Sequence, residues 1–305
     1  MSRPEAEPWW ESAFGAEYLS VYAHRDDALA GREVAALLKR LRGSPPRERQ
    51  APAWPDDAGQ RLAGTVSVRS GNPSASAQET IRGAAVAPAH ADTPEPGWSL
   101  AVPGSASGHL PLVLDAGCGT GRHLAHLRAA GLRAIGFDFS SHLLAVASRR
   151  PVTAGAVARA DLRLPPFPEA SFSAIFLLFT VFGYFDDDTN AAVLGRLARL
   201  LEPGGWLVLD LPDPVRLRAT LVPESQRPGR DGAIIHERRR LAGTRVEKDV
   251  TIRRGAEMLA TWRESVRIYE RAEIDALART SGLSPDPQPD PGDGGGRMVH
   301  WLRRG

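Results

Sequence analysis

The sequence predicts an α/β protein built on a doubly wound parallel sheet, with an antiparallel β-meander inserted before the last helix. Two observations lead to this fold class. Between residues 110 and 211, short apolar runs alternate with segments of helical periodicity, which is typical of a parallel sheet covered on both faces. After residue 228 the pattern changes to partial alternation of apolar and charged residues, which is typical of antiparallel strands with one wet face.

The composition is that of a soluble protein and excludes several classes. The chain has 305 residues, 42% of them hydrophobic, which is enough for one large core or two small ones. A formal charge of +2 argues against a protein that binds nucleic acid by neutralising phosphates. One cysteine excludes a disulfide framework, and no cluster of metal ligands stands out. With neither a signal peptide nor a membrane-length apolar run, we expect a cytoplasmic protein.

Three segments follow one another along the chain. Residues 1–42 are predicted to form a helical cap, because apolar residues recur there at helical spacing: Val34, Leu37, Leu38 and Leu41. Residues 43–109 are rich in Pro, Gly, Ser and Ala, so we expect a disordered insertion with at most a short strand at 65–69. Residues 110–305 are predicted to form the doubly wound domain, with the antiparallel subdomain at 228–270.

Each expected element has its own local signal. Strands of the parallel sheet are predicted where apolar residues follow one another: 112–115, 134–138, 156–160, 173–179 and 206–211. Ser140 and Thr189 stand where they would cap two of the intervening helices. Strands of the meander are predicted at 233–241, 245–253 and 259–269. A last helix over 272–281 ends before Gly282, and a final strand covers 298–302.

The turn after the first predicted strand carries three glycines, Gly117, Gly119 and Gly121. Glycines let the backbone turn tightly and let a ligand approach without meeting a Cβ atom. The spacing differs from the Gly-x-Gly-x-x-Gly of dinucleotide sites, and Asp115 precedes the first glycine by two residues. This pattern favours a nucleoside that carries an amino-acid tail and a positive charge over a nicotinamide dinucleotide.

Two further acids follow the next two strands. Asp138 ends the second strand, where a carboxylate can accept hydrogen bonds from both ribose hydroxyls. Asp161 and Leu162 follow the third strand, where the acid can accept from an adenine amine while the leucine packs on the ring. Each acid alone is as readily a helix cap or a turn residue. Together with the glycine turn they predict a nucleoside site at the carboxyl ends of the strands.

With these motifs in order, residues 110–211 resemble the class I S-adenosylmethionine-dependent methyltransferases. Residues 201–205, Leu-Glu-Pro-Gly-Gly, match the turn before the family's fifth strand, and Trp9–Tyr22 and Phe179–Phe185 resemble segments of a bacterial small-molecule subgroup. The resemblance implies a Rossmann-like methyltransferase domain with S-adenosylmethionine as cofactor. It implies these cofactor-binding residues: Asp115, Gly117, Cys118, Gly119, Gly121, Asp138, Phe139, Asp161, Leu162, Phe179 and Tyr18.

The same resemblance places the acceptor beside the segment after the fourth strand. Tyr22, Phe182 and Tyr184 are the expected acceptor-binding residues, although each of them also fits a core aromatic. His123 and Tyr184 are the candidate catalytic residues, because an acceptor hydroxyl or amine can require deprotonation. No general base is identifiable beyond these candidates.

The leading hypothesis is in-line transfer of a methyl group from S-adenosylmethionine to a small-molecule acceptor. The alternatives are a non-catalytic S-adenosylmethionine-binding regulatory module and an RNA or protein methyltransferase. Nucleic acid is disfavoured because Asp/Asn-Pro-Pro-Tyr is missing after the fourth strand and because Cys118 lies inside the glycine turn. The sequence does not decide the acceptor, the methylated atom or the oligomeric state.

Overall fold

The computed structural model describes residues 9–15, 17–22, 27–43, 112–288 and 296–305. The predicted insertion at 43–109 lies outside the described residues apart from Gly43, and so does the short strand suggested within it. The domain boundaries expected around that insertion therefore remain predictions.

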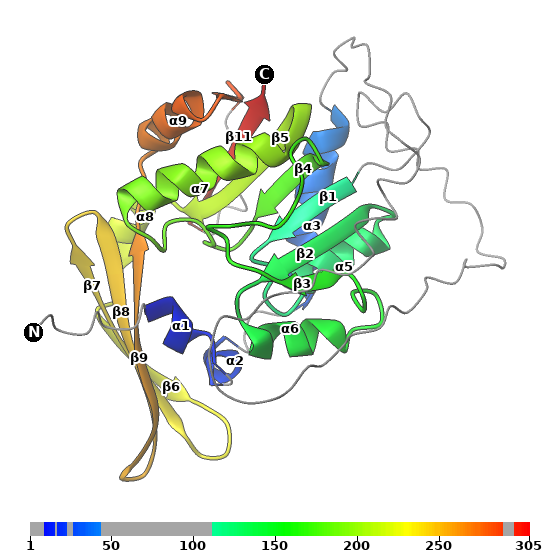
Figure 1. Cartoon of the computed structure of the whole chain (residues 1–305). Coiled ribbons are helices and arrows are strands. Elements are labelled where there is room, and N and C mark those ends of the chain that lie inside the picture. Colours follow the sequence, from blue (N-terminus) through cyan, green and yellow to red (C-terminus); the bar gives the residue numbers. More distant parts are fainter. Residues whose placement is uncertain (1–8, 16, 23–26, 44–111, 289–295) are drawn as a thin grey trace, which may run out of the picture.

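A seven-stranded sheet forms the centre of the protein, in the order β10-β11-β5-β4-β1-β2-β3 (Figure 1). Five strands run parallel: β1 (Leu112–Ala116), β2 (Arg133–Asp138), β3 (Val157–Arg159), β4 (Phe172–Leu177) and β5 (Leu201–Pro212). The strands β10 (Leu283–Pro285) and β11 (Arg297–Arg304) complete it in antiparallel pairing. The strand order reverses between β1 and β4, which is where open α/β sheets bind ligands.

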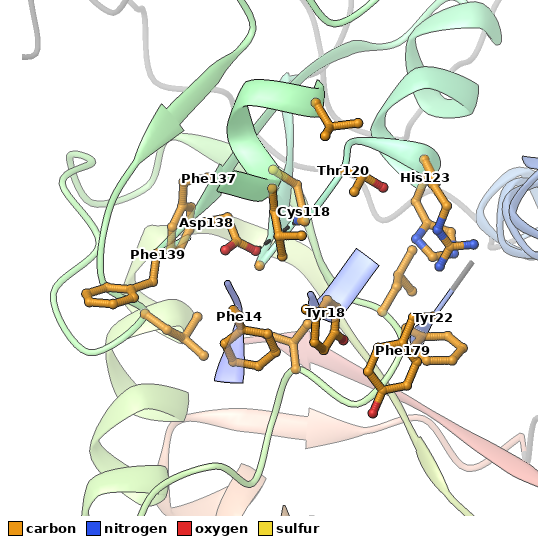
Figure 2. Close-up of a pocket in the computed structure, with 18 of the residues that line it drawn as sticks. Phe14, Tyr18, Tyr22, Cys118, Thr120, His123, Phe137, Asp138, Phe139 and Phe179 are labelled. Carbon is orange, nitrogen blue, oxygen red and sulfur yellow. Dashed lines mark hydrogen bonds between the residues drawn. The ribbon is translucent and has the colours of Figure 1, made fainter. Parts of the chain in front are cut away.

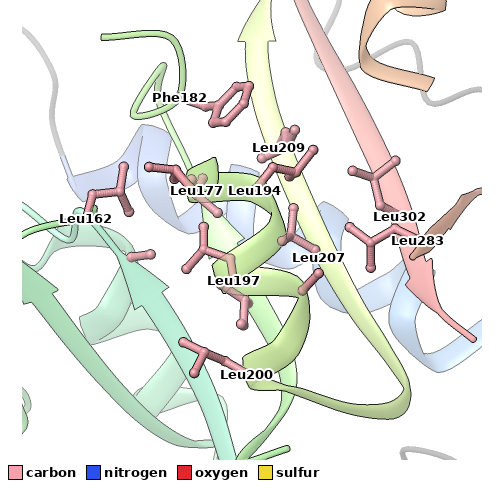
Figure 3. Packing of buried hydrophobic residues seen from close by; sticks show 14 of the residues in the cluster. Leu162, Leu177, Phe182, Leu194, Leu197, Leu200, Leu207, Leu209, Leu283 and Leu302 are labelled. Atoms are coloured by element: carbon pink, nitrogen blue, oxygen red, sulfur yellow. The ribbon is translucent and has the colours of Figure 1, made fainter. Parts of the chain in front are cut away.

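Helices cover both faces of this sheet, as the alternating pattern predicted. Two neighbouring residues of β1 face opposite layers. Val113 packs in a core with α3 (Asp27–Gly43) and α5 (Arg122–Ala129). Leu114 packs in the opposite core. That second core lies under α7 (Asp187–Leu200) and α9 (Arg271–Thr280), where leucines from helix and sheet interlock (Figure 3).

Two capping predictions have different outcomes. Ser140 caps α6 (Ser141–Ser148), since its hydroxyl accepts from the N–H of Leu143 at 3.2 Å. The prediction that Thr189 caps the next helix is wrong. Asp186 is the N-cap residue, and its carboxylate accepts from the Thr189 N–H, an orphan donor of the first turn, at 2.7 Å.

The antiparallel part contains four strands rather than the three predicted. The order is β6 (Glu224–Pro228), β7 (Ile234–Ala242), β8 (Arg245–Arg254) and β9 (Glu257–Arg267). The short helix α8 (Pro214–Thr220) leads from β5 into this sheet. Strand β6 was missed because its sequence, Glu-Ser-Gln-Arg-Pro, is polar throughout, as an edge strand can be.

The N-terminal cap packs on the apolar face of this second sheet. Ala13 of α1 (Trp9–Ala13) and Val21 of α2 (Tyr18–Val21) share a buried cluster with Ile235, Val250 and Trp262. Figure 1 shows α1 and α2 between the two sheets. The cap therefore bridges the meander and the end of the parallel sheet where β1 and β2 stop.

Strand β5 begins earlier than predicted. The Pro-Gly-Gly turn at its start remains part of the pairing with β4, in which Phe172 opposes Leu201 and Ala174 opposes Trp206. This irregular register absorbs the extra residues of the turn as a bulge. Among the described residues, no helix is long and apolar enough to cross a membrane.

Candidate active site

A pocket of about 600 Å³ opens at the carboxyl ends of the parallel strands. The glycine turn, the ends of β2 and β4 and the N-terminal cap form its walls (Figure 2). Twelve of the expected site residues line it: Tyr18, Tyr22, Gly117, Cys118, Gly119, His123, Asp138, Phe139, Asp161, Leu162, Phe179 and Tyr184. The other three, Asp115, Gly121 and Phe182, are not part of its lining.

The glycine turn is pinned to the neighbouring strand. The N–H groups of Gly117 and Cys118 both donate to the carbonyl of Phe137 at the end of β2, at 2.8 and 2.9 Å. Gly117 and Gly119 have φ values of +74° and +55°, which residues with a Cβ atom rarely adopt. The turn thus keeps its backbone open toward the pocket.

Asp138 is the acid best placed to meet a nucleoside. One carboxylate oxygen accepts from the Gly119 N–H at 2.9 Å and the other from the Ser140 N–H at 2.8 Å. Burial raises its pKa above the ordinary value, while these backbone donors act against the shift. The carboxylate is therefore held in place at the pocket wall with acceptor capacity to spare, since each oxygen has two lone pairs.

The second acid, Asp161, already has a cationic partner. The Arg163 guanidinium donates to it from Nε at 3.0 Å and from Nη2 at 2.6 Å. Burial alone would raise the pKa of Asp161, but its hydrogen bonds with Arg163 hold that pKa below its usual value. A ligand amine at this point would share an ionised carboxylate with Arg163, beside the buried Leu162.

Asp115 lies behind the glycine turn and away from the pocket. Its side chain is buried, and its Oδ2 has no hydrogen-bond partner among the described residues. Burial raises the pKa of Asp115 to about 6, against the attraction of the neighbouring His123 and Arg122. The carboxylate thus carries a cost in folding at neutral pH.

This raised pKa makes a stability prediction for Asp115→Asn. The pKa of Asp115 is higher in the folded than in the unfolded chain, so the fold favours the protonated side chain. The stability that this gives is full below about pH 4 and is lost as the pH rises through about 6. The variant is expected to be more stable than the native chain by about 2 kcal/mol at pH 8, with the difference shrinking toward pH 4. Urea unfolding at both pH values measures this, and a pH-independent difference would contradict it.

His123 lines the pocket and is held by the cap helix α3. Its Nε2 lies 2.6 Å from Oε2 of Glu33, and its side chain is largely buried. A carboxylate in this position fixes the orientation of the imidazole ring. The sequence could not reveal Glu33, because it precedes His123 by 90 residues.

The two tyrosines of the cap pack against each other in the pocket wall. The rings of Tyr18 and Tyr22 are 4.3 Å apart. The Tyr22 hydroxyl donates to Glu264 of β9 at 2.8 Å and accepts from Lys248 of β8. The cap is therefore fastened to the antiparallel sheet by polar contacts as well as by its apolar face.

The two aromatics after β4 have different surroundings. Tyr184 lines the pocket, with its ring 5.1 Å from that of Trp9. Phe182 is fully buried in the core beneath α7, where its ring lies 5.4 Å from that of Tyr269. Phe182 therefore packs in the core and does not line the pocket, so nothing in the structure supports the acceptor contact expected of it.

Arg245 also departs from expectation, since its position in the meander suggested a solvated face. Its guanidinium donates to the carbonyls of Gly183, Tyr184 and Phe185 at 2.9 to 3.2 Å. It also donates to Ser265 of β9. Arg245 therefore ties the loop after β4 to the antiparallel sheet.

Comparisons with known proteins find similarity to methyltransferases. Residues 113–205 match the family described as a methyltransferase domain. A demethylmenaquinone methyltransferase of Thermus thermophilus is 40% identical over 108 residues, which are 33% of this chain and 48% of that protein. A cypemycin N-terminal methyltransferase of a Streptomyces species is 29% identical over 191 residues, which are 58% of this chain and 76% of that protein.

One of the similar solved structures is a sugar N-methyltransferase of a Streptoalloteichus species. It is 25% identical, with a TM-score of 0.52, over 64% of this chain and 80% of that one. The chain spans about half the length of the Thermus relative that it matches.

Proposed function

We propose that this chain, whose residues 113–205 match a methyltransferase domain, is a class I methyltransferase that transfers a methyl group from S-adenosylmethionine to a small-molecule acceptor. The observation that carries this proposal is the position of Asp138. It stands at the end of β2, bonded to the glycine turn, on the wall of a pocket at the point where the strand order reverses.

In this proposal the ribose lies on Asp138 and the adenine lies between Asp161 and Leu162. The methionine part passes over the glycine turn, where Gly119 leaves room for it. Phe179 and the cap tyrosine Tyr18 then flank the cofactor from the other side. Aromatic faces suit this site, because they attract the positive sulfonium.

The sulfonium supplies an already activated methyl group, so the protein's task is to align the acceptor and exclude water. Alignment of this kind is worth about 7–11 kcal/mol of the barrier. The cap over the pocket provides the water exclusion, and Tyr22 and Tyr184 stand where an acceptor would enter. His123 with Glu33 and the Tyr184 hydroxyl are the candidate groups to hold or receive the acceptor's proton.

A small acceptor is favoured by the shape of the site. The volume of about 600 Å³ falls within the range of small-molecule pockets, about 300–1,000 Å³. Phe14, Tyr18 and Tyr22 of the cap are part of the lining, which leaves less room for a nucleic acid or a folded protein. The similarity to a sugar N-methyltransferase further favours a small amine as the acceptor.

The test is incubation of the full chain with methyl-labelled S-adenosylmethionine and separate pools of metabolites, transfer RNA and proteins. We expect S-adenosylhomocysteine to form only with the metabolite pool, with the label in a low-mass product. Label in RNA or protein would overturn the small-molecule proposal. Tight cofactor binding without S-adenosylhomocysteine in any pool would instead support the regulatory alternative.

A further inference from the structure

Phe179 of the pocket wall and the next residue, Thr180, have left-handed backbone conformations without being glycine. Phe179 and Thr180 follow β4 with φ values of +65° and +64°. Thr180 is β-branched, and such residues are the least suited to this region. Strain of this kind persists only where the surrounding structure enforces it, and it gathers at functional sites.

The groups that hold this conformation belong to two strands, β5 and β11, that come later in the chain. Asp210 near the end of β5 accepts from the Phe179 N–H through Oδ2 at 2.8 Å, and its carbonyl accepts from the Thr180 N–H at 3.0 Å. Arg297 at the start of β11 donates to Asp210 Oδ1 at 2.7 Å and to Thr180 Oγ1 at 2.8 Å. The same guanidinium lies 4.9 Å from the centre of the Phe179 ring.

We propose that Asp210 and Arg297 act as a positioning pair that holds the Phe179–Thr180 turn in its strained form, so that the Phe179 side of the cofactor site is preformed. This inference rests on the proposed function, because it gives Phe179 a place against S-adenosylmethionine. Neither Asp210 nor Arg297 lines the pocket, so both act through the turn.

The arrangement of charges fits this role. Asp210 is 8% exposed, and the Arg297 side chain is 18% exposed, so each charge depends on the other for compensation. The planar guanidinium of Arg297 donates to the Asp210 carboxylate and to the Thr180 hydroxyl at the same time. A lysine ammonium does not offer two donors in this fixed geometry. If the turn relaxed, the Phe179 ring would leave the pocket wall and cofactor binding would have to restore it.

The test measures the affinity for S-adenosylmethionine by calorimetry, which needs no acceptor. Arg297→Met removes the donors while keeping an apolar chain, and we expect it to weaken binding about tenfold. The affinity of Arg297→Lys should lie between those of the native chain and Arg297→Met. The matched control is Arg303→Met on the same strand, whose guanidinium lies over Trp206 at 5.2 Å and away from the pocket; it should change the affinity less than about twofold.

Thr180→Gly distinguishes a positioning role from a general structural one, because it should change how strongly the affinity for S-adenosylmethionine depends on Arg297. Glycine adopts a positive φ without a steric penalty, so the turn no longer needs to be held. Added to Arg297→Met, it should restore at least about threefold of the lost affinity. Unchanged binding in Arg297→Met, or a loss that Thr180→Gly does not relieve, would overturn the positioning role. A native chain that fails to bind S-adenosylmethionine would overturn the proposed function instead.

Discussion

Replacement of Asp138 by alanine is expected to weaken the binding of S-adenosylmethionine by about a hundredfold. Hydrogen bonds to an ionised group are worth about 1.5–3 kcal/mol each, and a ribose offers two hydroxyls to this carboxylate. The variant also loses the acceptor for the Gly119 N–H, which orients the glycine turn. Calorimetric titration with the cofactor and with S-adenosylhomocysteine measures the loss, which we expect for both ligands because both carry the ribose.

The control for this variant is Asp213→Ala. Asp213 also accepts from two backbone N–H groups, those of Val215 and Arg216, but it does not line the pocket. It should therefore lose a similar amount of stability and keep the native affinity. Thermal unfolding without ligand reports the stability of both variants. If Asp138→Ala is folded and binds within about threefold of the native chain, the ribose assignment is wrong.

The sequence predicted those parts of the site that depend on local chemistry. The glycine turn, the cap of α6 and the strands that end in acids can all be found within windows of about ten residues. These elements place Asp138 and Asp161 at one edge of the sheet without any knowledge of the long-range packing. The strand order then brings them to a single pocket, because carboxyl ends of parallel strands share an edge.

The direction of each side chain was beyond such reasoning. Asp115 and Asp138 both stand at the ends of parallel strands, yet only Asp138 lines the pocket. Phe182 and Tyr184 likewise belong to one apolar motif, yet one faces the core and the other the pocket. Which of two similar residues meets a ligand depends on the course of the turn after the strand, and the composition of that turn does not specify it.

Contacts between distant segments were equally hidden. Arg297 meets Asp210 across 87 residues, and Arg245 meets the loop carrying Tyr184 across 61. From the sequence, Arg245 belonged to the wet face of a predicted strand and no role was predicted for Arg297, because nothing nearby in the chain requires their hydrogen bonds. Their partners are mostly backbone carbonyls and a buried acid, which become visible only when the sheets are assembled.

The second large effect is expected for Gly117→Ala, which should destabilise the fold by about 3 kcal/mol or more. Gly117 has a φ of +74°, and a Cβ atom added there would lie 2.9 Å from Cγ2 of Val181 and still closer to its Cγ1. Val181 directly follows the strained Phe179–Thr180 turn. The new methyl group would therefore push the glycine turn and the loop after β4 apart, opening the pocket between them.

Gly155→Ala separates the steric part of this effect from the conformational part. Gly155 has a nearly equal φ of +72°, but an added Cβ would meet nothing within 4 Å. It should cost only the backbone penalty, about 1 kcal/mol, in the same urea unfolding experiment. The double variant Gly117→Ala, Val181→Ala should recover part of the loss, because the smaller side chain makes room for the added methyl group. Equal losses in Gly117→Ala and Gly155→Ala would mean that the glycine turn and Val181 are not in contact, and the pocket wall built on that contact would be wrong.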